Sequence, residues 1–157
     1  MKNLKLFLDD DEQEDFSLGL VRLTKHIAAH ELFYRINNLN PDSPFQRIAD
    51  IQKCGRYNDY LHICFESQHC ENKTKILFIQ NQSCQTIVKE AQTELFSGEE
   101  DVNYLLPLQP DVDYILKTSD DIPDFSLILL PENLMFPIQN FKLSSDDELF
   151  QLIQYYE

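Results

Sequence analysis

Residues 60–66 read YLHICFE and residues 75–81 read KILFIQN, and these two stretches decide the fold class. Both are rich in Ile, Leu, Phe and Tyr, which favour β-strands, and a polar turn-forming cluster at residues 71–73 lies between them. In the first stretch, positions 61, 63 and 65 are apolar, whereas positions 62, 64 and 66 carry His, Cys and Glu. This alternation predicts a strand with one buried face and one face in water.

The sequence on both sides extends this pattern. A similar run at residues 45–53 precedes a turn at residues 54–56, so the three runs predict an antiparallel meander. Shorter alternating or apolar runs predict further strands at residues 4–8, 16–23, 112–117 and 125–130.

Three segments have the apolar spacing of amphipathic helices, at residues 28–39, 86–96 and 145–156. The pair Asn40-Pro41 ends the first, Gly98 follows the second as a left-handed terminator, and the capping box from Ser145 to Glu148 opens the third. We therefore predict an α+β fold in a single domain over residues 1–157, with a mainly antiparallel sheet of five to seven strands and about three helices packed on it.

The charge of the chain is strongly acidic and unevenly distributed. The 157 residues include 13 Lys and Arg against 27 Asp and Glu, a formal net charge of −14. Residues 94–157 alone hold 14 acids and 2 bases, a net charge of −12. This charge repels phosphate backbones and anionic lipid surfaces, so we expect no direct binding to nucleic acid or membranes. A protein with a basic surface is the expected partner.

The first residues and the cysteines indicate the cellular compartment in which we expect the protein. Six acids within residues 9–15 follow a short apolar run, a pattern unlike a signal peptide, so we expect a cytoplasmic protein. The chain contains four cysteines, and in a reducing compartment we interpret them as free thiols.

Several clusters contain residue types that bind metals. His62, Cys64, His69 and Cys70 form H-x-C-x4-H-C, whose ligands suit Zn²⁺ but whose spacing matches none of the compact zinc motifs. We interpret them as residues packed in the sheet, with zinc binding as the open alternative. Two other clusters, His26 with His30 at helical spacing and the acids at residues 9–12, are interpreted as exposed side chains and a solvated turn.

A pair of acids, Asp111 and Asp113, lies two residues apart on a predicted strand. Both carboxylates would then face the same side about 7 Å apart, within reach of a shared cation or of paired acid and base chemistry. No histidine or third carboxylate at a defined spacing completes such a site, so we favour an exposed acidic strand.

The same segment carries a resemblance to a known family. Residues 106–114 read LPLQPDVDY, which resembles the signature of the bacterial IPExxxVDY family. The matching positions are Leu106 (in place of Ile), Pro107, Val112, Asp113 and Tyr114, whereas the chain has Leu at position 108 in place of the signature's Glu. The resemblance implies a small, single-domain bacterial cytosolic protein and supplies no catalytic residue.

The residues alone give a physical interpretation of this motif. Pro107 and Pro110 keep the chain extended as it enters a strand, in which Val112 and Tyr114 share one face and Asp113 takes the other.

The sequence contains no phosphate-binding loop, dinucleotide fingerprint or nucleophile elbow. We therefore expect no enzymatic activity, cofactor or metal. The favoured hypothesis is an acidic protein-interaction module with Asp111, Asp113 and Tyr114 as candidate contacts. A small metal-dependent enzyme and an acidic mimic of nucleic acid that binds a basic protein are the alternatives.

Overall fold

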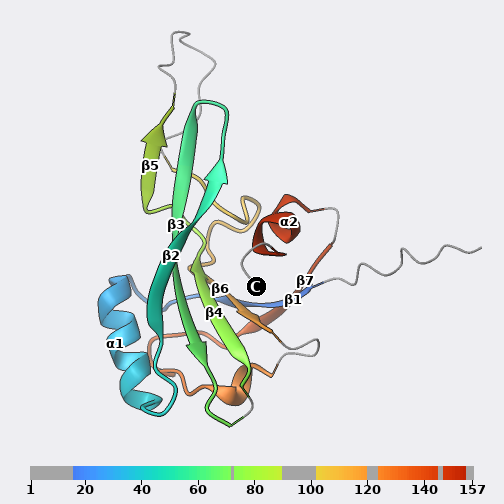
Figure 1. Ribbon diagram of the computed structural model, residues 1–157. Helices are drawn as coiled ribbons and strands as arrows, with labels where there is room; N and C mark the ends of the chain where they lie inside the picture. Colours follow the sequence, from blue (N-terminus) through green and yellow to red (C-terminus); the bar gives the residue numbers. More distant parts are fainter. Residues whose placement is uncertain (1–15, 72, 90–101, 120–123, 145–146, 155–157) are drawn as a thin grey trace, which may run out of the picture.

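The computed structural model describes residues 16–71, 73–89, 102–119, 124–144 and 147–154 (Figure 1). Its main element is one antiparallel sheet of seven strands, in the order β2-β3-β4-β6-β1-β7, with β5 paired to β3. The strands are β1 (Phe16–Val21), β2 (Gln46–Cys54), β3 (Asn58–Gln68), β4 (Lys75–Gln80), β5 (Gln85–Val88), β6 (Tyr114–Thr118) and β7 (Gln139–Leu143). The helices are α1 (Ala29–Leu39), α2 (Glu148–Gln154) and the short 3-10 helix η2 (Phe125–Leu127).

The long strand β3 organises the sheet. One of its edges pairs with β2 along almost its whole length. The other edge pairs with β4 at residues 64–68 and with β5 at residues 58–61. The meander predicted from residues 45–81 is therefore confirmed, and β5 continues it where β4 ends.

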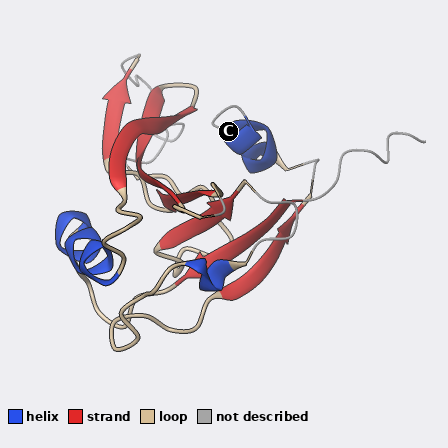
Figure 2. Cartoon of the chain, turned by 60° about the horizontal axis from the view of Figure 1, so that its bottom comes forward, coloured by secondary structure: helices blue, strands red, loops and turns tan. Residues whose placement is uncertain are grey.

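Helices α1 and α2 cover opposite faces of the sheet (Figures 1 and 2). On one face, Leu32, Phe33 and Ile36 of α1 are buried against a core of aromatic side chains. On the other face, α2 and residues 105–112 pack over an aliphatic core. The sheet thus has two hydrophobic cores, one on each face.

The aromatic core is centred on Phe33. Its ring stacks on Phe65 with centroids 3.8 Å apart, and it meets Phe78 and Tyr114 edge-on at 5.3 and 5.7 Å. Such offset and edge-on contacts add to the stabilisation from apolar burial. The predicted helix at residues 28–39 is confirmed, and it ends as expected at Asn40, whose backbone N–H donates to the carbonyls of Ile36 and Asn37.

Two local predictions were wrong, and one strand was not predicted. Residues 85–88 form a strand instead of the start of a helix, because the β-branched run from Thr86 to Val88 pairs with the free edge of β3. The rest of that predicted helix lies outside the described residues.

Residues 125–130 contain η2 instead of a strand, because the Asp124 carboxylate accepts a hydrogen bond from the Ser126 N–H and starts a turn. Strand β7 was not predicted. The described part of the chain therefore has two α-helices, fewer than the three expected.

The predicted orientation of β3 was also wrong. His62 and Cys64 were assigned to a wet face, but both are 0% exposed. That face lies beneath α2 and residues 105–112, two segments distant in sequence.

The C-terminal helix is present as α2, with Leu149, Phe150 and Ile153 buried. Within the described residues, no helix is long and apolar enough to cross a membrane. The strand predicted at residues 4–8 lies outside the described residues.

Candidate functional site

A buried asparagine, Asn81, holds the segment that precedes β6. This segment, residues 105–113, is called the 105–113 loop and leads directly into β6. The Asn81 side chain is completely buried, and its Nδ2 donates to the carbonyls of Gln109 and Val112, both at 3.0 Å. Its Oδ1 accepts from the Leu106 N–H at 2.8 Å. The Asn81 backbone adds bonds to Leu105 and Asp113, so one residue fixes both ends of the loop.

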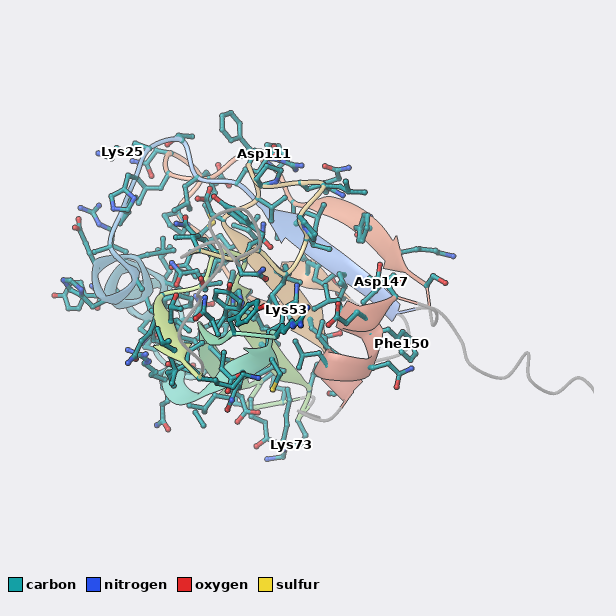
Figure 3. All side chains as sticks on the ribbon, turned by 90° about the horizontal axis from the view of Figure 1, so that it is seen from above. Lys25, Lys53, Lys73, Asp111, Asp147 and Phe150 are labelled. Atoms are coloured by element: carbon teal, nitrogen blue, oxygen red, sulfur yellow. The ribbon has the colours of Figure 1, made fainter. Side chains whose placement is uncertain are left out.

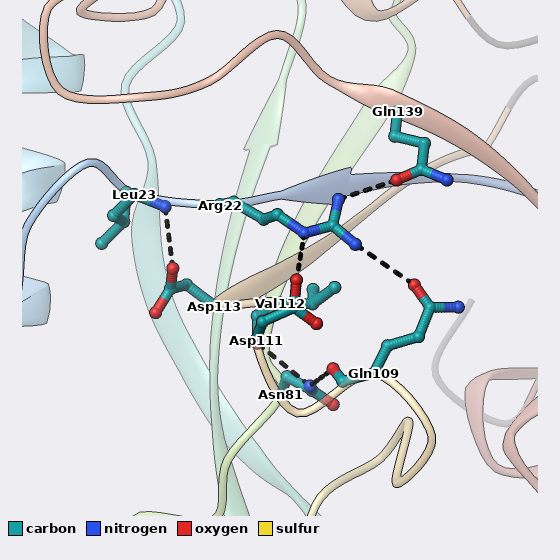
Figure 4. A network of polar contacts seen from close by, with 8 residues as sticks. All are labelled: Arg22, Leu23, Asn81, Gln109, Asp111, Val112, Asp113 and Gln139. Atoms are coloured by element: carbon teal, nitrogen blue, oxygen red, sulfur yellow. Dashed lines mark hydrogen bonds and ion pairs between the residues drawn. The ribbon is translucent and has the colours of Figure 1, made fainter.

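Arg22, just after β1, holds the same loop from its outer side (Figure 4). Its Nε donates to Oδ2 of Asp111 at 2.6 Å, and its other two nitrogens donate to the side chains of Gln139 and Gln109 at 2.8 and 3.3 Å. The hydrogen bond from Arg22 lowers the pKa of Asp111. Arg22 therefore connects the ends of β1 and β7 to the loop.

The two acids predicted as a pair have separate partners. Asp113 Oδ2 accepts the backbone N–H of Leu23 at 2.7 Å, whereas Asp111 is bonded to Arg22. Neither lies on a strand, because β6 begins at Tyr114. The prediction that both carboxylates lie on one strand and face the same side is therefore wrong. Each acid instead accepts a hydrogen bond that fixes the loop.

The candidate contact Tyr114 is buried and only 2% exposed. Burial raises the pKa of its hydroxyl to about 12. Tyr114 packs in the aromatic core, whereas Val112 packs in the aliphatic core on the other face. The prediction that these two residues share a face, and that Tyr114 contacts a partner, was therefore wrong.

The extended entry predicted for Pro107 and Pro110 was wrong for a similar reason. Successive turns bend the loop, with the Gln109 N–H donating to the Leu106 carbonyl and the Val112 N–H donating to the Gln109 carbonyl. The loop therefore bends back over the sheet before it enters β6, instead of approaching the strand in an extended conformation.

A cleft of about 310 Å³ lies between the folded loop and α2. Residues 105–109 line it on the loop side, Leu149 and Leu152 line it from α2, and Phe141 lines it from β7. Lys53 of β2 also reaches this cleft, and Figure 3 shows it on the side of the sheet that carries α2. Leu106 and Pro107, two positions of the resemblance, thus belong to the wall of an apolar cleft.

Charged side chains surround the apolar lining. Asp147 and Glu148, at the start of α2, line the cleft and are exposed. Asp147 Oδ1 also accepts the Leu149 N–H at 3.0 Å and caps α2, a role that the sequence had assigned to Ser145, which lies outside the described residues. Lys53 Nζ donates to the Tyr104 carbonyl at 3.2 Å. The rim therefore has two exposed acids and one lysine that already has a protein partner.

His62 lies on the sheet face that carries this cleft and is completely buried. Its Nδ1 lies 3.0 Å from the Gln80 carbonyl, which can only accept, so Nδ1 carries the proton and Nε2 has the lone pair. Burial lowers the pKa of His62 to about 4. The imidazole is therefore neutral at physiological pH.

The structure separates the four residues of the predicted zinc group. His62 and Cys64 are buried within β3, whereas His69 and Cys70 lie beyond its end, roughly 20 Å along the strand from His62. No group of three or more His, Cys, Asp or Glu within the described ranges is arranged to hold a metal ion. The four cysteines are free thiols, as predicted.

The other two clusters with metal-binding residue types are the histidine pair His26 and His30 and the acids at residues 9–12. His26 lies before α1, which begins at Ala29, so His26 and His30 do not share a helix. Both are exposed. The acidic cluster at residues 9–12 lies outside the described residues.

Sequence reasoning missed the residues that build the cleft, above all Asn81, Arg22 and Lys53. The one signal in the sequence was Asn81 itself, a polar residue directly after the apolar run of β4, where a buried amide can fix a neighbouring loop. The long-range partners of Arg22 had no local signal.

The chain matches no protein-family model, and comparison with curated proteins and with solved structures finds no significant similarity.

Proposed function

We propose that the chain is a non-enzymatic protein-interaction module that binds a partner with a basic surface. The observation that supports this function most strongly is the acidic surface of the C-terminal half of the chain. Of its two basic residues, Lys117 is buried in β6 and only 5% exposed, which leaves Lys142 as the exposed base. Asp111, Asp124, Glu132, Asp147 and Glu148 are all exposed.

Not all of these acids are equally suited to a partner. Asp111 is already paired with Arg22, and Asp124 accepts hydrogen bonds from Ser126 within its own turn. Asp147 and Glu148 stand beside an apolar cleft, where charge and apolar area can act together. Charged groups around an apolar centre are the usual composition of a protein interface. The contacts proposed here therefore move from Asp111, Asp113 and Tyr114 to the acids at the start of α2.

Affinity purification from the native cell tests this function. The tagged chain should retain a protein with a predominantly basic surface, and added salt should release it because exposed charge pairs are screened. The double variant Asp147→Asn with Glu148→Gln should retain less of the same protein. A partner with an acidic surface, or retention that does not change with salt, would contradict the proposal.

A further inference from the structure

We infer that the cleft between α2 and the 105–113 loop binds a peptide segment of the partner, with a large apolar side chain inside the cleft and lysine or arginine side chains on its acidic rim. This inference rests on the proposed function and names the chemistry of the partner. It depends on four features of the cleft: its apolar lining, the fixed loop on one side, the charges on its rim, and an exposed leucine that extends the lining to the surface.

The lining and size of the cleft suit an apolar anchor. About 310 Å³ is at the lower end of the roughly 300–1,000 Å³ that ligand pockets occupy. The walls consist of aliphatic and aromatic side chains from three separate segments: Leu105, Leu106, Leu108, Phe141, Leu149 and Leu152. A few buried anchors of this kind contribute most of the affinity in peptide recognition. The space therefore fits one or two side chains of a peptide.

The wall on the loop side is rigidly held. Asn81 bonds the loop at Leu106, Gln109 and Val112, and Arg22 bonds it at Gln109 and Asp111. A cleft that is already formed does not need to order its walls when a ligand binds, which lowers the entropic cost of association. The hydrogen bonds from Asn81 and Arg22 thus hold the loop side of the apolar cleft in place.

The rim selects the charge of the segment. Asp147 and Glu148 are both exposed, and the ammonium of Lys53 donates to the Tyr104 carbonyl. The local charge is therefore negative, on a chain with a net charge of −14. Basic side chains beside the apolar anchor complement this rim, and acidic ones would be repelled.

Leu108 extends the apolar lining to the surface. Its side chain lines the cleft and is 95% exposed, a large exposure for a leucine in a loop that is held at both ends. A second copy of the chain could insert the same leucine, but it would bring another net charge of −14 against the acidic rim. A basic segment avoids this repulsion, so we favour a basic partner over self-association.

Selection from a phage-displayed library of short random peptides, with the full chain as bait, tests the inference directly. Enriched peptides should share a large apolar residue with lysine or arginine near it. Their binding should perturb the methyl NMR signals of Leu106, Leu108, Leu149 and Leu152. Enrichment of acidic peptides, enrichment of none, or perturbation at other methyl groups would overturn the inference.

Two matched pairs of variants locate the binding. Asp147→Asn with Glu148→Gln keeps a capping oxygen on α2 and should weaken a selected peptide several-fold at low salt. Asp42→Asn with Glu132→Gln changes the total charge equally at exposed positions outside the cleft and should leave affinity nearly unchanged. Leu108→Ala should weaken binding about tenfold, whereas Leu129→Ala, at another exposed leucine, should not.

The outcomes separate this inference from the proposed function. If basic peptides bind in a salt-dependent way but both charge variants weaken them equally, the cleft is not the site, and the broader interaction function stands. If acidic peptides or none are enriched, the inference about the cleft fails, and the salt-dependent retention of a basic protein in the affinity purification decides the proposed function separately. If sedimentation shows a dimer that Leu108→Ala dissociates, a second copy occupies the cleft and the inference is overturned.

Discussion

The side-chain amide of Asn81 donates a hydrogen bond of 3.0 Å to the carbonyl oxygen of Val112, 31 residues further along the chain. The same amide bonds Gln109, and its oxygen accepts from Leu106. A buried side chain with three hydrogen bonds is costly to remove, because each buried backbone group left without its partner costs roughly 1–3 kcal/mol of stability. The 105–113 loop therefore depends on one residue outside it.

The variant Asn81→Ala should lower the free energy of unfolding by about 3 kcal/mol or more, since the Leu106 N–H and two carbonyls would lose their partner in the interior. Urea unfolding monitored by circular dichroism measures this change. Asn133→Ala removes an exposed asparagine side chain and should change stability by less than about 0.5 kcal/mol. Equal stabilities of the two variants would show that the Asn81 network does not hold the loop.

The ion pair between Arg22 and Asp111 gives a prediction about protonation. Since the hydrogen bond from Arg22 lowers the pKa of Asp111, Arg22→Gln should raise that pKa toward its ordinary value of 3.8. The pair stabilises the folded state above the ordinary pKa of Asp111, and this contribution is lost as the pH falls through the lowered value. NMR titration of the Asp111 carboxyl carbon measures the shift.

The matched control for that titration is Arg35→Gln, which removes an arginine paired with Glu31 on α1. It should leave the titration of Asp111 unchanged. If the titration curve of the Asp111 carboxyl carbon is the same in the wild-type protein and in Arg22→Gln, the role assigned to Arg22 is contradicted.

Local patterns in the sequence predicted much of the sheet and of α1. The alternation in β3, the turn between β3 and β4, and the Asn40-Pro41 stop each depend on neighbouring residues, so a sequence window contains the information. Residues 85–88 show the limit of this reasoning. Their spacing fits a helix, but their β-branched side chains and the open edge of β3 favour a strand.

The candidate site could not be predicted in the same way because its parts meet only in the folded chain. Arg22 and Asp111 are 89 residues apart, and the cleft joins the loop, β7 and α2. The burial of His62 was missed for a related reason, because an imidazole on an alternating strand looks like a surface residue until other parts of the chain pack on it. Hydrophobic periodicity carries no information about which distant parts these are.

Gly19 in β1 provides a test of packing between β1 and its neighbours. A Cβ atom at this position would lie 2.7 Å from Cγ2 of Ile138 and 3.3 Å from the ring of Phe125. Gly19→Ala should therefore destabilise the protein by about 1–3 kcal/mol, as overpacking of a well-filled core does. Gly55→Ala is the control, since Gly55 lies in a turn without a positive φ and should change stability little. Differential scanning calorimetry of both variants distinguishes overpacking from a general effect of replacing glycine.

The buried imidazole of His62 gives the protein a defined sensitivity to acid. Burial lowers its pKa from 6.5 to about 4, with smaller influences from Lys53 and Asp50. Between these two pH values the unfolded chain binds a proton at His62 that the folded chain excludes, so the free energy of unfolding falls as the pH falls. Once the pH is below about 4, this difference in pKa has lowered the free energy of unfolding by about 3 kcal/mol. His62→Gln removes the titrating group and should therefore flatten the stability profile between pH 6.5 and 4 relative to the wild type.

Urea unfolding at several pH values across this interval gives the comparison, which uses the difference between variant and wild type because the carboxylates titrate in both. His30→Gln replaces an exposed histidine and should follow the wild-type curve. If His62→Gln and the wild type lose stability in parallel, His62 is already protonated or hydrated in the folded state. A flatter curve for His62→Gln alone assigns this part of the acid sensitivity to the buried imidazole of His62.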